Sequence, residues 1–253
     1  MDLGLKGRTA LVCASTGGLG EATARALAAE GARVVVAGRR GRRAREIAAE
    51  LPDAIGIEAD LLSAEGVEHL VAAAGQVDIL VLNGPGPRPG TAADATCDDV
   101  TAAVDALVRP HQRLISLTLP GMRARGWGRI LAIGSSGIIA PLPNLAMSNL
   151  GRAALAAYLK TLAAEVAADG VTVNLLLPGR IATDRVAQLD AAAAGRAGTS
   201  VAEVEAASRA TIPAGRYGRP EEFGQVAAFL CGEPASYVTG TALRCDGGLV
   251  RTL

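Results

Sequence analysis

Three closely spaced glycines between a short apolar strand and a helix are the clearest sign of chemistry in this sequence. Gly17, Gly18 and Gly20 follow the apolar run 9–14 and open a segment with apolar residues at helical spacing. Such a turn places backbone N–H groups and the positive end of a helix dipole under a bound phosphate. Glycine suits it because a Cβ atom would obstruct the turn or the phosphate. The stretch therefore predicts dinucleotide binding; the alternative is a tight turn that binds nothing.

Alternating strands and helices surround this turn and must position it. Apolar runs predict strands over residues 9–14, 33–37, 54–59, 77–82, 128–134, 171–176 and 241–245. Helices are expected over residues 42–51, 64–74, 98–125 and 146–168, with another beginning at Pro220. Because the strand runs are continuously apolar, they suit a parallel sheet covered on both faces. The sequence thus predicts an α/β fold of the Rossmann type, a doubly wound parallel sheet of about seven strands.

The chain is expected to form one domain over residues 1–253, with residues 183–218 as a helical insertion within it. This Ala-rich segment predicts two helices separated by Gly198, the second capped by Thr199 or Ser200. Insertions at the carboxyl edge of such sheets often form lids over a binding site. Ordinary packing helices are the alternative interpretation.

Composition argues against several classes of function. The 25 basic and 25 acidic residues balance, and aromatic residues make up 2%, so we expect no nucleic-acid partner. We expect no membrane segment, since no run reaches about 18 apolar residues, and the N-terminus lacks a signal-peptide pattern. The four cysteines lack C-x-x-C spacing, which predicts free thiols in a reducing cytoplasm. With two histidines in the chain, no metal site is expected.

Several short motifs occur in an order typical of one enzyme family. They are the turn CASTGGLG at residues 13–20, Asp60 with Leu61, Asn83 with Gly84, Pro178 with Gly179, Ile181 and Thr183. The turn stands where the family has TGxxxGxG, and Asn83 remains from an NNAG motif. On these residues the chain resembles the short-chain dehydrogenase/reductase family over essentially its whole length, in particular 3-oxoacyl-[acyl-carrier-protein] reductase-like members.

This resemblance implies a nicotinamide dinucleotide cofactor. Its contacts are expected from Ala14, Ser15, Thr16, Gly18, Leu19, Gly20, Arg39, Asp60, Leu61, Asn83, Gly84, Arg152, Pro178, Gly179, Ile181 and Thr183. Arg39 closes the second strand, where an acidic residue would bind ribose hydroxyls and an arginine suits a 2′-phosphate. Arg40, Arg42 and Arg43 add positive charge nearby. We therefore expect NADP(H) rather than NAD(H); a solvated basic loop is the alternative.

The resemblance fails in the catalytic residues. Oxidoreductases of the family use a serine, a tyrosine, a lysine one helical turn after it, and an asparagine on the preceding helix. Ser135 matches the serine. The family's spacing then puts Ser148 at the tyrosine position, Arg152 at the lysine position and Leu107 at the asparagine position. Ser135, Ser148 and Arg152 are accordingly the candidate catalytic residues.

These replacements change the proton chemistry that the site can perform. An aliphatic hydroxyl such as that of Ser148 is a poor general acid near neutral pH, and Arg152 stays protonated. An arginine can still donate forked hydrogen bonds to ribose hydroxyls, a substrate carboxylate or a carbonyl. Tyr158 and Lys160 do not restore the pair, because side chains two residues apart on a helix face away from each other. His111 is a speculative replacement acid; a helix histidine without a catalytic role is the simpler interpretation.

The expected function is that of an NADP(H)-dependent oxidoreductase acting on a carbonyl or alcohol of a small-molecule substrate. Ser135 and Arg152 would stabilise the developing oxyanion. The alternative is a non-redox enzyme (dehydratase, isomerase or cyclase) or a catalytically silent cofactor-binding subunit on the same fold. The resemblance also implies a homotetramer whose interfaces are formed by the two long helices and the last strand.

Overall fold

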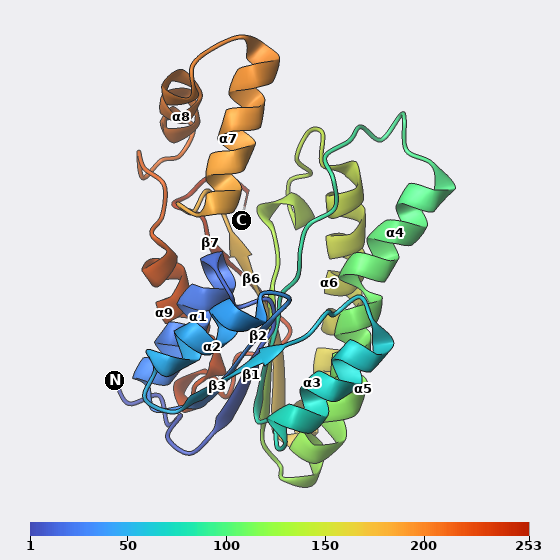
Figure 1. The fold of residues 1–253 in the computed structure, drawn as a ribbon, viewed down its shortest axis with the longest axis vertical. Coiled ribbons are helices and arrows are strands. Elements are labelled where there is room, and N and C mark those ends of the chain that lie inside the picture. The colour runs from blue at the N-terminus through green and yellow to red at the C-terminus, as the bar shows by residue number, and fades with distance from the viewer. Residues whose placement is uncertain (253) are drawn as a thin grey trace.

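Seven parallel strands form a sheet at the centre of the molecule (Figure 1). The computed structural model describes residues 1–252 and places the strands in the order β3-β2-β1-β4-β5-β6-β7. Their bounds are β1 Thr9–Val12, β2 Arg33–Gly38, β3 Ala54–Glu58, β4 Ile79–Leu82, β5 Gly128–Ile133, β6 Val171–Pro178 and β7 Ala242–Cys245. The predicted doubly wound α/β fold is confirmed. The strand order reverses between β1 and β4, and ligands of such sheets bind at that switch point.

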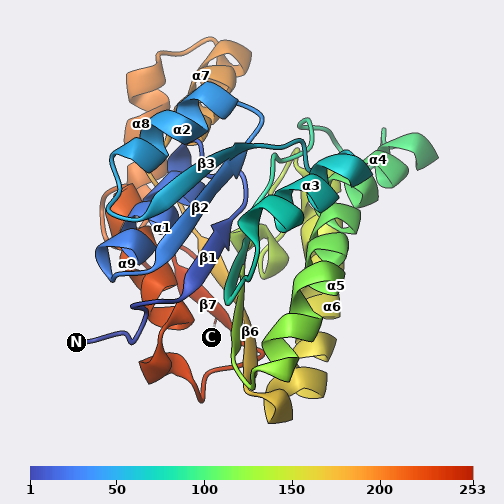
Figure 2. The ribbon, with the colours of Figure 1, turned by 60° about the horizontal axis from the view of Figure 1, so that its bottom comes forward.

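Helices cover both faces of this sheet (Figure 2). One layer consists of α1 Gly18–Ala29, α2 Gly41–Ala49 and α9 Pro220–Cys231. The other consists of α3 Ala64–Ala74, α4 Cys97–Leu107, α5 Arg109–Ala124 and α6 Ala146–Val166. Successive strand residues point to opposite faces. Leu11 and Leu80 therefore join the core under α3, α5 and α6, whereas Val12 and Val81 join the core under α1, α2 and α9.

The prediction of one helix over residues 98–125 is wrong. The structure has two helices, α4 and α5, separated at Val108. Pro110 explains the break, because it has no N–H to donate to the carbonyl of Ala106 and its ring crowds the preceding turn. By contrast, the predicted helix over residues 64–74 has the same bounds as α3.

Two helices follow β6, as the Ala-rich segment predicts. They are α7 Asp184–Ala197 and α8 Val201–Ala210, and both stand beyond the carboxyl edge of the sheet (Figure 1). Gly198 ends α7 in the left-handed conformation, and Ser200 caps α8 by accepting a hydrogen bond from the N–H of Glu203. The buried Asp190 of α7 accepts hydrogen bonds from Arg180 Nη2 at 2.5 Å and from Tyr217 Oη at 2.9 Å. These bonds anchor α7 to the segments beside it.

Membrane-crossing helices and metal-binding clusters are both absent from residues 1–252. None of the helices combines the length and the apolar character that a bilayer crossing requires. Nor do three or more His, Cys, Asp or Glu side chains in this part of the chain come together in a way that could hold a metal ion.

Candidate cofactor and active site

The glycine turn joins the carboxyl end of β1 to α1 in tight packing. Ala14 adopts a positive φ of 46°, and its carbonyl accepts a hydrogen bond from Asn83 Nδ2 at 3.2 Å. A Cβ atom on Gly20 would lie 2.5 Å from the Ala14 carbonyl oxygen and 2.9 Å from Asn83 Nδ2. Glycine is therefore required at position 20 for β1, α1 and the end of β4 to approach this closely. The predicted residues Ala14, Gly20 and Asn83 lie together.

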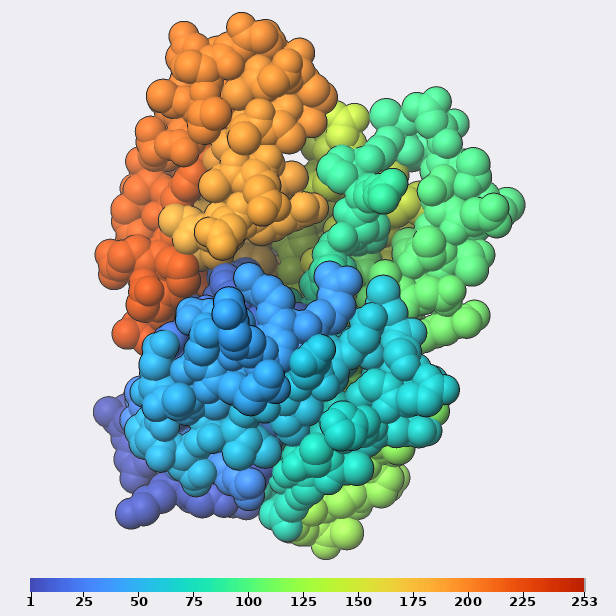
Figure 3. Space-filling view, viewed as in Figure 1, coloured from blue at the N-terminus to red at the C-terminus, as the bar shows by residue number. Residues whose placement is uncertain are grey.

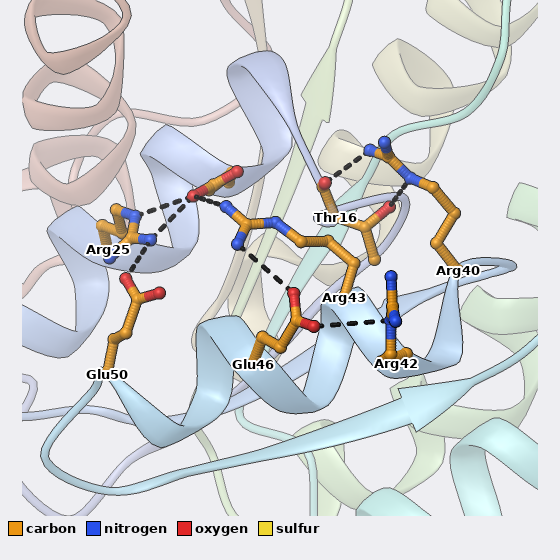
Figure 4. A network of polar contacts seen from close by, with 8 residues as sticks. Thr16, Arg25, Arg40, Arg42, Arg43, Glu46 and Glu50 are labelled. Atoms are coloured by element: carbon orange, nitrogen blue, oxygen red, sulfur yellow. Dashed lines mark hydrogen bonds and ion pairs between the residues drawn. The ribbon is translucent and has the colours of Figure 1, made fainter.

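Ser15 and Thr16 direct their side chains into the protein. The fully buried Ser15 hydroxyl donates to the Val12 carbonyl at 2.7 Å and accepts from the N–H of Ala37 at 2.9 Å, which ties β1 to β2. Thr16 receives two hydrogen bonds from Arg40, one from Nε to its hydroxyl at 3.3 Å and one from Nη2 to its carbonyl at 2.5 Å (Figure 4). Leu19 is half-buried against the core under α1.

Arg40 thus lies across the glycine turn. A Cβ atom on Gly17 would be 2.8 Å from Arg40 Nη2. Arg40, Gly41, Arg42, Arg43 and Glu46 line a hollow of about 420 Å³ at the start of α2. Arg42 and Arg43 form ion pairs there with Glu46 (Figure 4). Arg39 and Arg40 form no ion pair with any described residue, and Arg39 is exposed.

The segment after β6 crosses the same edge of the sheet. The N–H of Gly179 donates to the Cys245 carbonyl at 3.0 Å, and a Cβ on Gly179 would lie 2.7 Å from Asp246 Cα. Thr183 accepts a hydrogen bond that caps α7, and its methyl carbon is 3.8 Å from where a Cβ on Gly18 would stand. The structure therefore brings Thr183 over the glycine turn.

The remaining predicted cofactor residues end neighbouring strands or flank the segment after β6. Asp60 is exposed after β3, and its Oδ1 accepts a hydrogen bond from the N–H of Leu62 at 3.1 Å. Leu61 packs against the core under α3, and Gly84 follows Asn83 at the end of β4. Pro178 ends β6, and Ile181 is buried with 3% of its surface exposed. Their roles in cofactor binding stay predictions.

Arg152 links α6 to the carboxyl end of β5. Its Nη1 donates to the carbonyls of Ile133 at 3.1 Å and Gly134 at 3.2 Å, and its Nε donates to Ser148 Oγ at 3.3 Å. Burial lowers the pKa of this guanidinium, and the positive charge of Arg185 lowers the pKa further. An arginine nevertheless keeps its proton at neutral pH. Ser148 and Arg152 are therefore joined by a hydrogen bond, and neither is suited to supply a proton.

Ser135 stands directly after the two carbonyls that hold Arg152. Its Oγ accepts a hydrogen bond from the N–H of Gly137 at 3.0 Å, and its O–H donates to no acceptor among residues 1–252. The hydroxyl hydrogen is therefore available to a ligand. The loop that follows is held by Asn149, whose Nδ2 donates to the Leu142 carbonyl at 3.0 Å. Sequence reasoning missed Asn149, because no local pattern connects it to that loop.

Comparison with known proteins agrees with this architecture. A family model described as enoyl-(acyl carrier protein) reductase matches residues 13–250. The chain belongs to the short-chain dehydrogenase/reductase family. A 3-oxoacyl-[acyl-carrier-protein] reductase from Aquifex aeolicus is 33% identical over 269 residues, which cover 98% of this chain and 100% of that protein. Human dehydrogenase/reductase SDR family member 4 is 34% identical over 255 residues, covering 96% of this chain and 88% of that protein.

A solved structure is also closely similar. L-Sorbose reductase from Gluconobacter frateurii, complexed with NADPH and L-sorbose, has a TM-score of 0.93 and 32% identity, with 100% of both chains covered. Family and relatives together support an NAD(P)-dependent oxidoreductase.

Other polar residues of this short-chain dehydrogenase/reductase do not rebuild the tyrosine and lysine pair. Tyr158 packs against the core under α6, whereas Lys160 is exposed and donates to the Gly240 carbonyl at 2.7 Å. The expectation that they face apart is confirmed. Leu107, at the asparagine position, ends α4 and packs where a Cβ on Gly151 would come within 2.8 Å of its Cδ1.

His111 is buried beneath the loop after β4. Its Nδ1 lies 2.7 Å from the Leu107 carbonyl and must donate there, because a carbonyl only accepts. Nε2 is then an acceptor in the neutral ring, and it has no hydrogen-bond partner among the described residues. Burial lowers the pKa of His111, which favours the neutral ring. A neutral, enclosed imidazole is poorly placed to act as an acid.

Proposed function

We propose that this protein is an NADP(H)-dependent oxidoreductase that acts on the carbonyl or alcohol of a small molecule through a non-standard catalytic site. The observation that carries the proposal is that Arg152 is bonded to the carbonyls of Ile133 and Gly134, directly before Ser135 at the carboxyl end of β5. These residues share the edge of the sheet at which Asn83, Gly20 and Thr183 surround the glycine turn. Switch-point edges of this kind bind dinucleotides.

The preference for NADP(H) is inferred from two arginines, Arg39 and Arg40. Neither forms an ion pair with a carboxylate of the described residues. Arg39 is exposed at the end of β2, and Arg40 lies across the glycine turn. Both suit a 2′-phosphate, which arginine binds through forked, charge-assisted hydrogen bonds. L-Sorbose reductase, a neighbour in structure, was solved with NADPH.

Cofactor choice is tested by replacing Arg39 with aspartate. Arg39→Asp should weaken NADPH binding about ten- to a hundred-fold and leave NADH binding nearly unchanged, because a charged hydrogen bond contributes roughly 1.5–3 kcal/mol. Fluorescence titration with both cofactors measures this. Arg196→Gln, which removes an exposed charge from the far end of α7, is the control. Equal binding of NADH and NADPH by the unmodified protein would contradict the preference.

The protein's own side chains are proposed to act by stabilising negative charge on the substrate oxygen. A bound NADPH supplies the hydride. The free O–H of Ser135 and one of the two unused N–H groups on Arg152 Nη2 would donate to the substrate oxygen as negative charge develops there. Because neither Ser148 nor Arg152 releases a proton near neutral pH, the proton would come from water.

We propose a single domain in which residues 183–218 cover the substrate. α7 and α8 stand beyond the carboxyl edge of the sheet, and Asp190 anchors α7 there. A homotetramer is the proposed assembly. Val100 on α4, Leu117 on α5, Leu150 on α6 and Leu243 on β7 are exposed apolar residues on the elements proposed to pair. Light scattering at micromolar concentration would show a monomeric mass if this is wrong.

The non-redox alternative rests on the loss of the usual acid. The deciding experiment follows NADPH oxidation with a panel of ketones and thioester-linked oxo acids, alongside NADPH binding. Turnover of any member supports the oxidoreductase. Tight NADPH binding without turnover across the panel would favour a dehydratase, isomerase, cyclase or silent subunit instead.

A further inference from the structure

Arg152 carries a half-buried positive charge that no acidic side chain balances. Its three hydrogen bonds all go to neutral oxygens, and it forms no ion pair with the described residues. Two other arginines that link separate elements do have an acidic partner. Arg129 pairs with Glu233, and Arg180 pairs with Asp190. Withdrawing a charge partly from water without a counter-charge is costly, so we expect an anion to bind there.

A second arginine faces the same region and increases the excess of positive charge. Arg185, in the first turn of α7, reaches toward the loop after β4, where its Nη2 is 3.8 Å from the position of a Cβ on Gly86. It forms no ion pair or hydrogen bond with residues 1–252, and its positive charge lowers the pKa of Arg152. The space-filling view shows a hollow between α7, in orange, and the loop between β4 and α4, in blue-green (Figure 3).

The free donors of Arg152 match a carboxylate. An arginine has five N–H groups. Those on Nε and Nη1 are occupied, and the two on Nη2 have no acceptor among the described residues. A carboxylate accepts such donors with matching geometry, and an arginine contributes charge as well as direction.

We propose that the substrate is an oxo acid, or the hydroxy acid formed from it, whose carboxylate lies between Arg152 and Arg185. The proposal rests on the proposed oxidoreductase function and names its substrate class. In the reduction, the carbonyl carbon receives the hydride from NADPH, which becomes NADP⁺. The carbonyl oxygen receives a proton from water, and the carboxylate does not react.

The spacing expected between the carbonyl and the carboxylate of the substrate follows from the adjacency of Ser135 and Gly134 in the chain. Ser135 comes directly after Gly134, whose carbonyl holds Arg152. Ser135 and one Nη2 N–H of Arg152 would thus bind the reacting oxygen, while the other Nη2 N–H binds the carboxylate beside it. We expect acids with the carbonyl next to the carboxylate, or one carbon away, to bind better than acids with a longer spacer.

Calorimetric titration of the protein saturated with NADP⁺ tests the proposal without relying on turnover. The probes are α-ketobutyrate, its methyl ester and levulinate, which has the longer spacer. We expect the acid to bind at least about ten-fold more tightly than its ester, with levulinate weaker than α-ketobutyrate. Arg185→Gln should reduce the preference for the acid about ten-fold, Arg185→Lys should retain part of it, and Arg196→Gln should leave it unchanged.

Two results would overturn the proposal. One is an ester that binds as tightly as its acid, including the case in which neither binds. The other is an Arg185→Gln protein that binds NADP⁺ more weakly but keeps the same preference for the acid, which would make the cofactor's pyrophosphate the anion. Parallel assays separate this from failure of the proposed function. If the acid binds but NADPH is not oxidised, only the proposed redox function is contradicted. If neutral ketones are reduced without a preference for acids, only the proposal of an anionic substrate is contradicted.

Discussion

Two regions lie at the same edge of the sheet: the glycine turn after β1 and the contact of Arg152 with the end of β5, here called the arginine junction. They differ in the interactions that determine their geometry. At the turn, close backbone approaches decide the residue type, since a Cβ on Gly20 would come within 2.5 Å of the Ala14 carbonyl. At the junction, the hydrogen bonds of Arg152 to Ile133 and Gly134 decide the geometry, while the chemistry depends on side-chain pKa. A cofactor site made by the backbone can therefore persist while the proton-transfer groups beside it change.

The largest expected effect is on kcat, from a substitution beside the arginine junction. Ser135→Ala should lower kcat by up to about 10²–10³-fold, because one donor to the developing oxyanion is lost. KM for the substrate should change little. Ser136→Ala is the matched control, since Ser136 is adjacent and buried with 5% of its surface exposed. Steady-state kinetics that show equal losses for both variants would mean that Ser135 is not the donor.

On the turn side, Gly20→Ala should weaken NADPH binding about ten- to a hundred-fold. The added Cβ must displace the Ala14 carbonyl or Asn83, and overpacking of this kind costs roughly 1–3 kcal/mol. Gly195→Ala is the control, because a Cβ there meets nothing within 4 Å. Cofactor titration and thermal unfolding of both variants measure the difference. Normal NADPH binding by Gly20→Ala would show that the turn does not approach the cofactor.

Rebuilding the usual pair would test whether the missing acid is the junction's only defect. The double variant Ser148→Tyr/Arg152→Lys should raise the rate of carbonyl reduction by about ten-fold or more, since a positioned general acid contributes typically 10²–10⁴-fold. Arg152→Lys alone serves as the reference, because it also loses the hydrogen bonds to the β5 carbonyls. A double variant no faster than that reference would indicate that Leu107 or the shape of the site directs other chemistry.

The smallest expected effect concerns how readily a reagent reaches Cys13, which lies just before the glycine turn. Cys13 is fully buried just before the turn, and burial raises the pKa of its thiol to about 12. The group therefore stays protonated below that pH and unreactive at pH values near neutrality. Mass spectrometry after brief exposure to iodoacetamide should find the exposed Cys97 labelled and Cys13 unlabelled. Rapid labelling of Cys13 without cofactor would indicate that β1 opens readily.

Much of the architecture follows from local patterns in the chain. The continuous apolar runs predicted the parallel sheet, and the bounds of α3 matched residue by residue because Ser63 caps it and Gly75 follows it. The break at Val108 was missed, although Pro110 marks it, because the apolar spacing continues on both sides of the proline. The positions of Ser135, Ser148 and Arg152 came from family spacing, and the structure brings Arg152 and Ser148 together at the end of β5.

Contacts between distant segments could not be predicted in this way. Nothing near Arg152 in the chain indicates that its guanidinium binds the carbonyls of Ile133 and Gly134, or that the charge of Arg185 lowers its pKa. Likewise, Arg40 rather than Arg39 contacts Thr16. Helix caps, strand runs and glycine turns depend on interactions within a few residues, so the sequence alone determines them. The charge balance at the junction depends on how β5, α6 and α7 pack, and only the tertiary structure decides it.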